Sequence, residues 1–458
     1  MALPNGPTTH HFVQQLQLIL NPLGYMEQCT QQYGEIFTAC FSGLGKIVMI
    51  SHPQAMQEIL TSNAFDAPGR LNKLLKPFFG DQSMILLEGE HHKQRRQLLM
   101  PPFHGERMRN YGDRICTLTQ EVAANLALGQ PFIARSVMQE ITMRVILHVV
   151  FGMDEGPRFQ QLKPLLGQIL DLTGSPLRAS VIFLPWLQQD WGPWSPWGRM
   201  LRQQQQLDEL LFAEIEERRS QADPNRTDIL SLMLAARDEA GQGMTNEEVR
   251  DELMTMLVAG HETTATALAW AFYWIHTLPE VREKLLQELD SLGDNPDPMT
   301  IFRLPYLTAV CQETLRIYPV ALVTFSREVR KPVNLMGHEL EPGTVVAGSI
   351  YLAHRREEVY PEPGKFKPER FLERQFSPYE FLPFGGGARR CLGLALAQFE
   401  MKLVLATMLR DYELTLAEKK PVQPQRRGLT LAPAGGVRMV MTGRRLRQER
   451  PEPVATVV

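Results

Sequence analysis

Hydrophobic positions recur with helical spacing through the middle of the chain and with alternating spacing near its beginning. The short runs EIFTACF and KIVMIS, separated by SGLG, predict two strands, and PQAMQEILTS predicts a helix after them. Long segments that begin at residues 105, 199 and 246 place apolar residues three or four apart and predict amphipathic helices. We therefore expect a mainly α fold with minor β, with a small β-containing lobe at about 30–65 and a helical body at about 90–325.

Clusters of Gly, Pro and Asp interrupt these patterns. The stretches SQADPNRTD, GDNPDPMT and AEKKPVQPQRRG predict loops, and none is long or biased enough for a domain linker. The last residues, about 444–458, are charged and proline-containing, which predicts a loose tail. The whole chain, 1–458, is thus expected to form one helix-rich domain.

Composition narrows the classes of function. A net charge of -3 argues against a nucleic-acid partner, which requires a basic excess. Five cysteines, odd in number and without a CxxC pair, suit a reducing compartment. The start of the chain has no basic segment followed by an apolar core, and no run of about 18 apolar residues occurs, so we expect a cytoplasmic protein without a transmembrane anchor.

The stretch FLPFGGGARRCLG, residues 381–393, places three glycines and two arginines before Cys391. Glycines in a row indicate a close backbone approach or positive φ. An apolar helical pattern follows the cysteine, and a helix N-terminus stabilises a thiolate. No second ligand stands at zinc spacing and no CxxCH occurs, which leaves an inert buried cysteine or a thiolate ligand to haem iron.

The pattern Phe384-x-x-Gly387-x-Arg389-x-Cys391-x-Gly393 resembles the haem-binding signature of the cytochrome P450 family. This resemblance implies the P450 fold, a haem b cofactor, Cys391 as the metal ligand, and Phe384 and Gly393 beside it; the loop and the helix after it are expected at about 381–412. Two further family elements occur in the expected order, and they are Glu313-x-x-Arg316 and Pro368-Glu-Arg370-Phe. In the family these residues form a structural network; in isolation the pair Glu313 and Arg316 would be a solvated helix face.

The stretch AGHETT, residues 259–264, resembles the oxygen-activation motif of the same family. The resemblance implies catalytic roles for two residues, a proton relay through Glu262 and a hydrogen bond from Thr263 to dioxygen, with His261 as a spacer. A threonine can also bond to the carbonyl four residues back in a helix, and without the family context that simpler interpretation would stand.

Basic residues from three segments match family positions that bind the haem propionates. They are His92, Arg96, Arg327 and Arg389; taken singly, each would be a surface charge. Lys93, Arg95 and Arg390 flank them and are candidates for docking a separate ferredoxin or flavodoxin, although solubility is an equally simple explanation.

The family resemblance also assigns a substrate-binding region. The predicted lining residues are apolar: Leu74, Leu75, Phe78, Phe79, Ile85, Leu257, Val320, Ala321, Leu322 and Leu429. Trp186, Trp191, Trp194 and Trp197 fall in a segment that resembles the family's lid. The expected function is a monooxygenase that hydroxylates or epoxidises a hydrophobic small molecule with O₂, a long-chain fatty acid first and a terpenoid second. A P450 that uses peroxide or rearranges a hydroperoxide, and a haem-binding sensor, are the alternatives.

Overall fold

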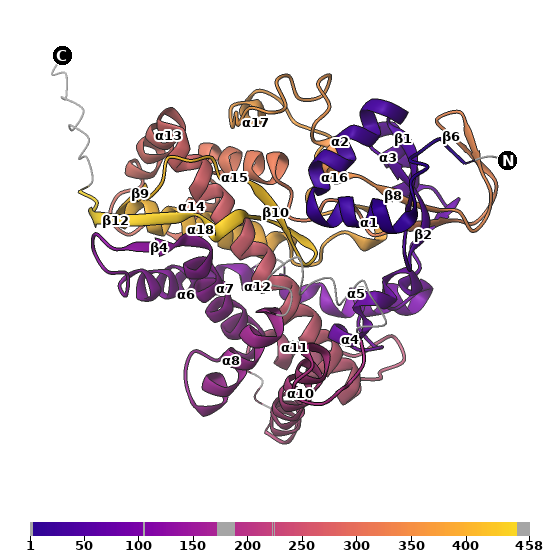
Figure 1. The fold of residues 1–458 in the computed structure, drawn as a ribbon. Coiled ribbons are helices and arrows are strands. Elements are labelled where there is room, and N and C mark those ends of the chain that lie inside the picture. Colours follow the sequence, from indigo (N-terminus) through magenta and orange to yellow (C-terminus); the bar gives the residue numbers. More distant parts are fainter. Residues whose placement is uncertain (1–2, 104–105, 172–187, 222, 224, 447–458) are drawn as a thin grey trace, which may run out of the picture.

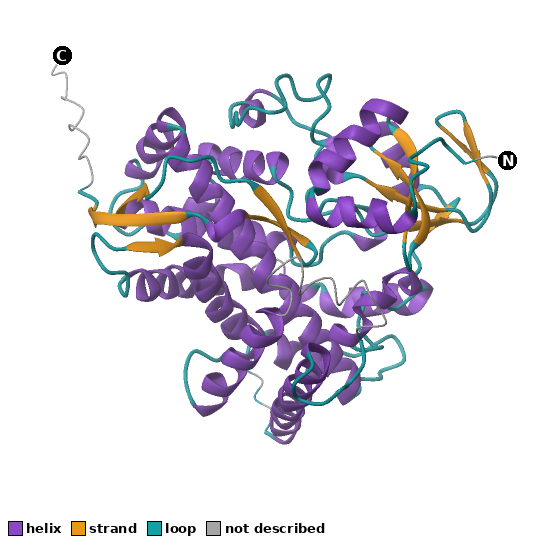
Figure 2. Ribbon diagram, viewed as in Figure 1, coloured by secondary structure: helices purple, strands orange, loops and turns teal. Residues whose placement is uncertain are grey.

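A computed structural model describes residues 3–446 apart from 104–105, 172–187, 222 and 224. A β-rich lobe that contains the N-terminus lies on the right in Figure 1, and a larger helical body extends to the left and below it. Figure 2 shows strands in that lobe, at the opposite edge and near the centre, with helices between them. The mainly α fold with minor β predicted from the sequence is confirmed.

The β-rich lobe is built on a five-stranded sheet with strand order β1-β2-β8-β5-β3. The two predicted strands form its first hairpin, in which Phe37 lies opposite Met49. Helix α3 follows as predicted. The bounds in this lobe are α1 His11–Leu20, α2 Pro22–Tyr33, β1 Ile36–Phe41, β2 Gly45–Ile50, α3 Pro53–Thr61, β3 Phe65–Asp66, β5 Arg327–Val329, β6 Val333–Leu335, β7 His338–Leu340, β8 Val345–Gly348 and α16 Ile350–Ala353.

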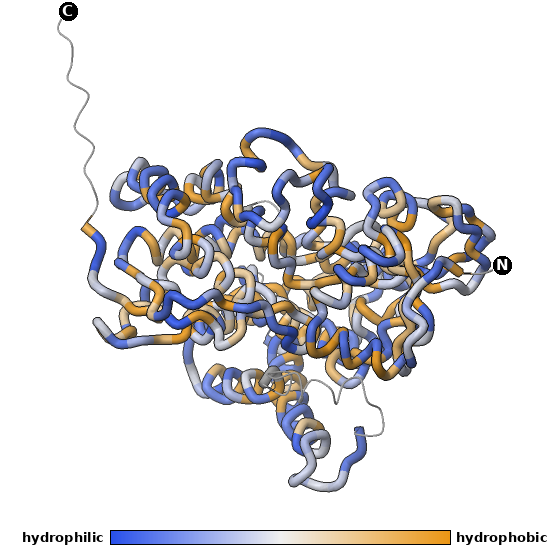
Figure 3. Tube along the Cα trace, turned by 45° about the horizontal axis from the view of Figure 1, so that its top comes forward, coloured by the Kyte–Doolittle hydropathy of each residue, from blue (hydrophilic) through white to orange (hydrophobic). Residues whose placement is uncertain are grey.

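Helix α12 (Asn246–Thr277) crosses the centre of the molecule and packs most extensively against α7 (Ala134–Phe151). It begins with a capping box in which Thr245 and Glu248 satisfy each other's backbone N–H groups. Its residues are buried on nearly all sides, as expected for a helix with apolar residues around its whole circumference. The outer helices instead alternate between hydrophobic and hydrophilic segments (Figure 3).

The remaining helices surround α12. Their bounds are α4 Lys76–Phe79, α5 Gly89–Leu99, α6 Glu106–Ala123, α8 Pro157–Asp171, α10 Pro196–Ser220, α11 Ile229–Ala235, α13 Pro279–Asp290, α14 Pro298–Phe302, α15 Pro305–Ile317, α17 Arg370–Glu373 and α18 Leu394–Asp411, with 3-10 turns at η1 Gly69–Leu75, η2 Pro101–Phe103, η4 Gly387–Arg389 and η5 Ala434–Gly436. Among the described residues, no helix is both long and apolar enough to cross a bilayer.

The end of the chain differs from the expectation in two places. The segment predicted as a loop before Gly428 contains β10 (Pro424–Arg427), which pairs with β11 (Thr430–Pro433) across a turn where Gly428 has φ +59°. The tail predicted from about residue 444 is not loose at its start, because Arg444 ends β12 (Arg438–Arg444) and Arg445 is ion-paired with Asp290. Strand β12 lies between β4 (Pro131–Ile133) and β9 (Tyr412–Leu416). Residues 447–458 of the predicted tail lie outside the described residues.

Candidate active site

The glycines before the cysteine are required by the backbone. Gly385 has φ +66° and Gly387 has φ +63°, a region that residues with a side chain rarely adopt. A Cβ atom on Gly387 would also lie only 2.4 Å from the carbonyl oxygen of Leu60. The Cys391 N–H donates to the Phe384 carbonyl at 3.0 Å and closes the turn. Residues 381–393, the cysteine loop, therefore have a conformation that favours glycine at two positions, and at Gly387 a side chain would also clash.

Cys391 combines accessibility with a deep position. Its side chain is exposed, yet burial raises the pKa of its thiol, whereas the Gly393 N–H, Arg96 and Arg390 act in the opposite direction. Both properties hold together for a thiol that faces accessible space inside the protein. Helix α18 begins directly after Gly393, so its positive end is directed at the sulfur. This chemistry suits a ligand atom better than an inert core cysteine.

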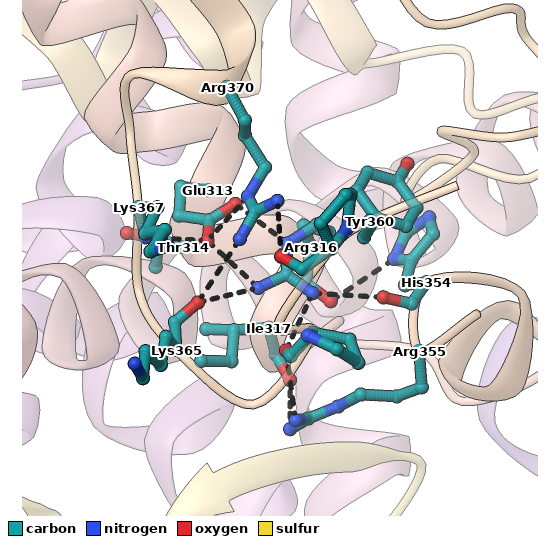
Figure 4. Close-up of polar contacts among 12 residues, drawn as sticks. Glu313, Thr314, Arg316, Ile317, His354, Arg355, Tyr360, Lys365, Lys367 and Arg370 are labelled. Carbon is teal, nitrogen blue, oxygen red and sulfur yellow. Dashed lines mark hydrogen bonds and ion pairs between the residues drawn. The ribbon is translucent and has the colours of Figure 1, made fainter. Parts of the chain in front are cut away.

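Glu313, Arg316 and Arg370 come together in the Glu313 network, shown in Figure 4. Arg316 on α15 binds the carboxylate of Glu313 through two nitrogens, at 2.6 and 2.8 Å, and Arg370 adds a third contact at 3.2 Å. The Lys367 N–H also donates to Glu313, and the Tyr360 ring lies 5.1 Å from the Arg316 guanidinium carbon. The pair is fully buried and hydrogen-bonded, unlike a solvated surface pair.

His354 connects this network to the cysteine loop. Arg316 donates to the His354 carbonyl at 2.9 Å, and the His354 ring contacts the Arg316 carbonyl through Nδ1 at 3.2 Å. Its Nε2 accepts the Leu382 N–H at 3.1 Å, which fixes the proton on Nδ1. Burial, followed by the charge of Arg316, lowers the pKa of His354 to about 3. Sequence reasoning missed His354, because a lone histidine in LAHRR carries no local signal.

A second group of charges, the basic cluster of His92, Arg96, Arg327 and Arg389, converges from α5, β5 and the cysteine loop. The pKa of His92 is lowered to about 4 by burial and then by the charges of Arg389, Arg96 and Arg327, so all three lie near it. Arg96 also interacts electrostatically with Cys391. Within the described chain, the Arg96 side chain makes no hydrogen bond or ion pair, and the cluster thus has capacity for an anion.

Two arginines of the cluster, Arg327 and Arg389, are held by backbone carbonyls. Arg327 donates to the carbonyls of Phe325 and Gly386, at 2.7 and 2.9 Å. Arg389 donates only to backbone carbonyls as well. Burial lowers the pKa of both guanidinium groups to about 10, although Asp66 acts against this at each of them.

On α12, Glu262 and Thr263 point to different surroundings. Glu262 is buried and pairs with Arg135 and Gln139 of α7, and its Oε1 lies 3.5 Å from Nε of Arg427 on β10. Thr263 is half-buried and donates to the Ala259 carbonyl at 2.6 Å. Ala259 is exposed although α12 is otherwise a core helix, so this turn faces accessible space.

Two neighbouring residues of the motif serve packing. A Cβ on Gly260 would lie 2.9 Å from the side chain of Ile146, so this glycine allows α7 to approach α12. His261 is buried, with Nδ1 2.8 Å from the hydroxyl of Thr142, and burial lowers its pKa to about 3. It is a core histidine, as its expected spacer role requires.

The three cations that were candidates for docking an electron donor lie in different surroundings. Lys93 is exposed and pairs with Glu90, and Arg390 is exposed. Arg95 is buried and ion-paired with Glu248 and Glu252 of α12. Arg95 is therefore not a docking residue, because its charge is neutralised inside the protein.

Most predicted substrate-lining residues before α5 gather in one place. Phe78 and Phe79 form an apolar cluster with Trp197 and Met200, the Phe78 cluster, against which Leu75 and Ile85 pack. Their neighbour from α12 is Val258 and not the predicted Leu257, which is buried in the main core because it lies on the other side of the helix. Leu74 is half-buried in η1.

The lining residues expected after α15 are spread over several surroundings. Val320 packs against the main core, Leu322 packs against the core of the β-rich lobe, and Ala321 is exposed. Leu429 is 51% exposed at the tip of the β10–β11 turn. Of the expected lid, residues 172–187 with Trp186 lie outside the described residues, whereas Trp191 and Trp194 are exposed and Trp197 is buried.

Comparisons with known proteins agree on one family. The cytochrome P450 family model matches residues 4–438. Cytochrome P450 135B1 of Mycobacterium tuberculosis is 35% identical over 96% of this chain and 91% of its own length, and cytochrome P450 138 of the same organism is 35% identical over 97% of both chains. The retinoic acid-bound cyanobacterial CYP120A1 shares 26% identity and superposes with a TM-score of 0.84, covering 96% of this chain and 100% of its own.

The fold and site define a haem-thiolate oxidoreductase. The chain belongs to the cytochrome P450 family, whose members are monooxygenases.

The described residues fit the haem that this family implies. The Cys391 thiol is accessible, and a Cβ on Gly393 would meet nothing within 4 Å, so the protein's own packing does not require this glycine. The basic cluster would balance two propionates. When bound, haem supplies the activation of O₂ for oxygen insertion into a C–H bond, and a thiolate ligand donates electron density to the iron. Cys391 would hold the iron, and His92, Arg96, Arg327 and Arg389 would face the propionates.

Proposed function

We propose that this P450 hydroxylates or epoxidises a long-chain fatty acid. The observation that carries the proposal is the Phe78 cluster, which brings Phe78, Phe79, Trp197 and Met200 together beside Val258 of α12. Val258 directly precedes the exposed turn at Ala259, so the apolar wall continues toward the oxygen-activation motif. An apolar wall of this kind favours an alkyl chain over a polar substrate.

In this proposal Thr263 and Glu262 handle protons. The Thr263 hydroxyl donates a hydrogen bond to the Ala259 carbonyl, and in that position its oxygen can still accept a hydrogen bond from a donor such as water. Glu262 is held by Arg135 and Gln139, so it would relay a proton only after one of these contacts opens. Electrons would come from a separate ferredoxin or flavodoxin with its reductase, steered by exposed cations such as Arg390.

A terpenoid acid is the second candidate substrate. The structural neighbour CYP120A1 was solved with retinoic acid, an isoprenoid carboxylic acid. An apolar wall accommodates either chain, and the two candidates share a carboxylate attached to a long hydrocarbon. Binding titrations with palmitic acid and retinoic acid distinguish them, with the displacement of iron-bound water as the optical readout.

The ligand assignment has its own test. We expect Cys391→Ser to abolish the ferrous–CO difference band of thiolate-ligated haem, because only a thiolate gives that band. Cys116→Ser is the matched control, since Cys116 is a half-buried cysteine on α6. An unchanged band in Cys391→Ser would refute the ligand assignment.

A further experiment separates the monooxygenase from a peroxide-using enzyme and from a haem sensor. We expect product with NADH, O₂ and redox partners, and about tenfold or greater loss of product per NADH in Thr263→Ala, since positioned proton transfer contributes at least this much. Equal turnover with hydrogen peroxide in both proteins would instead support the peroxide-using alternative. No product from any oxidant, with an intact haem spectrum, would support a sensor.

A further inference from the structure

The loop between α4 and α5, residues 80–88, is attached to the first turns of α12. The Gln82 N–H donates to Oδ2 of Asp251 at 2.8 Å. The loop also approaches the same carboxylate at Gly80, where a Cβ atom would lie only 2.1 Å from Oδ1 of Asp251. Gly80 has φ +86°, so both its conformation and this close approach require a residue without a side chain. The position of Asp251 therefore determines where the loop begins.

Arg250 connects Asp251 to another helix. Its Nη1 donates to Oδ1 of Asp251 at 2.7 Å, and its Nε donates to Oδ1 of Asp208 on α10 at 2.8 Å. Its Nη2 contacts Asp208 as well. The Arg250 side chain is buried, with 8% of its surface exposed. One arginine of α12 thus joins α10 to the α4–α5 loop through two carboxylates, and we call Asp208, Arg250 and Asp251 the Arg250 bridge.

The two carboxylates of the bridge repel each other, and Arg250 offsets that repulsion. Burial raises the pKa of Asp208, the contact with Arg250 acts in the opposite direction, and the charge of Asp251 raises the pKa further. Charges in a partly buried site are screened less by salt than charges on the surface. Removal of the arginine would therefore convert an attraction between α10 and the loop into a repulsion.

The same elements also meet in the Phe78 cluster. Trp197 and Met200 of α10 pack there with Phe78 and Phe79 of α4, and Ile85 of the α4–α5 loop packs against them. The Arg250 bridge meets α10 about two turns further along the helix. Apolar packing is non-directional, whereas charged hydrogen bonds favour one relative position. The bridge is thus suited to fix how closely α10 approaches the loop.

We propose that Arg250 is a positioning residue that holds α10 against the α4–α5 loop and so keeps the Phe78 cluster closed around the substrate. The inference rests on the proposed function, in which that cluster forms the apolar wall of the substrate site. Arg250 acts through Asp208 and Asp251 rather than on the substrate itself.

Hydrogen exchange on the haem-loaded protein, measured residue by residue, tests this inference. We expect Arg250→Gln to speed exchange of the Gln82 N–H about tenfold or more, because Asp251 is no longer held in place to accept it. The Met84 N–H donates to Glu252 at 2.8 Å and serves as the internal reference, because that contact does not depend on Arg250. Its exchange should therefore change less than that of Gln82.

A second substitution separates the charge of Arg250 from its packing. The double variant Arg250→Gln/Asp208→Asn has no repulsion between the carboxylates, so exchange at Gln82 should slow again, by about threefold or more relative to Arg250→Gln. Lost packing would not be restored by this change. The inference is overturned if the double variant exchanges as fast as Arg250→Gln, or if Arg250→Gln itself exchanges at the wild-type rate.

Arg218→Gln is the matched control. Arg218 is an arginine of α10 that is as buried as Arg250, and it binds Glu214 of the same helix and Asp228 at the start of α11. Its loss should loosen α10 without changing exchange at Gln82 relative to Met84. Equal acceleration at Gln82 in Arg218→Gln and Arg250→Gln would mean that general loosening of α10 explains the effect, and the inference would fail.

A binding measurement extends the test to the substrate site. Arg250→Gln should release palmitic acid about threefold faster or more, because an opened apolar wall retains its ligand for a shorter time. The wild-type rate of release in this variant would overturn the role in substrate binding. If the wild type shows no response to palmitic acid, the substrate proposal fails, whereas the exchange experiment still decides whether Arg250 positions the loop.

Discussion

Two groups of arginines are linked to the cysteine loop, one through His354 and the other directly, and they differ in what balances their charge. In the Glu313 network, the Glu313 carboxylate binds both Arg316 and Arg370 inside the protein. In the basic cluster, His92, Arg96 and Arg327 lie together without a carboxylate bound to any of them by a hydrogen bond among the described residues. The first group stabilises the protein by itself, and the second is suited to an anion that the protein must bind.

The difference distinguishes buried charged residues that stabilise the fold from those that bind a ligand. A buried guanidinium whose five donors are all engaged by the protein is part of the scaffold, and Arg316 meets this description. A guanidinium with unengaged donors beside an accessible thiol, as at Arg96, indicates a ligand site.

The largest effect is expected for the Glu313 network. Glu313→Ala leaves two buried arginines without their carboxylate, which should cost about 3–5 kcal/mol of unfolding free energy. Urea unfolding followed by circular dichroism measures this. Glu373→Ala, at a solvent-facing glutamate of α17, is the control. Wild-type stability in Glu313→Ala would mean that the network is a solvated pair in solution.

Loss of Arg96 should have an intermediate effect of a different kind. Arg96→Gln removes a charged donor for the cofactor, which is worth about 1.5–3 kcal/mol, or roughly tenfold or more in haem affinity. The haem-free protein should unfold at the wild-type urea concentration, because Arg96 makes no side-chain bond to the described part of the chain. A loss of stability without loss of haem affinity would erase the distinction between the two groups.

The third effect concerns pH. A histidine in an unfolded chain titrates near pH 6.5, whereas burial lowers the pKa of folded His354 to about 3. As the pH falls below about 6.5, this histidine binds a proton in the unfolded chain but not in the folded protein. The free energy of unfolding therefore decreases by about 1.4 kcal/mol per pH unit for this group until about pH 3.

Thermal unfolding at pH 7.5 and pH 5.0 measures this loss. His354→Gln should be less stable at pH 7.5 because it loses the contact to Leu382, but it should lose less stability on acidification. His11→Gln, at an exposed histidine, should follow the wild type. Equal acid sensitivity in His354→Gln would show that other buried groups dominate, such as His261 or His276.

The sequence predicted the elements with strong periodicity, such as α12 and the β1–β2 hairpin, and the pairing of Glu313 with Arg316. It could not predict His354 or the acceptors of Arg389, because these contacts join residues 38 to 322 positions apart and depend on tertiary packing. It placed Arg95 on the surface and Leu257 in the substrate-binding region, whereas Arg95 is buried in ion pairs and Leu257 lies in the main core. A residue's neighbours on a helix face are set by what packs there. Spacing identifies a face of a helix, and only the fold shows what that face meets.

The pairing of β4 with β12 has a consequence for how the protein is made. Pro131 lies opposite Val440, so β4 has no partner in this sheet until about 300 further residues have been synthesised. Until then β4 is an unpaired segment of the nascent chain, and long-range β pairing of this kind forms slowly. Translation products truncated before β12 should therefore depend on chaperones.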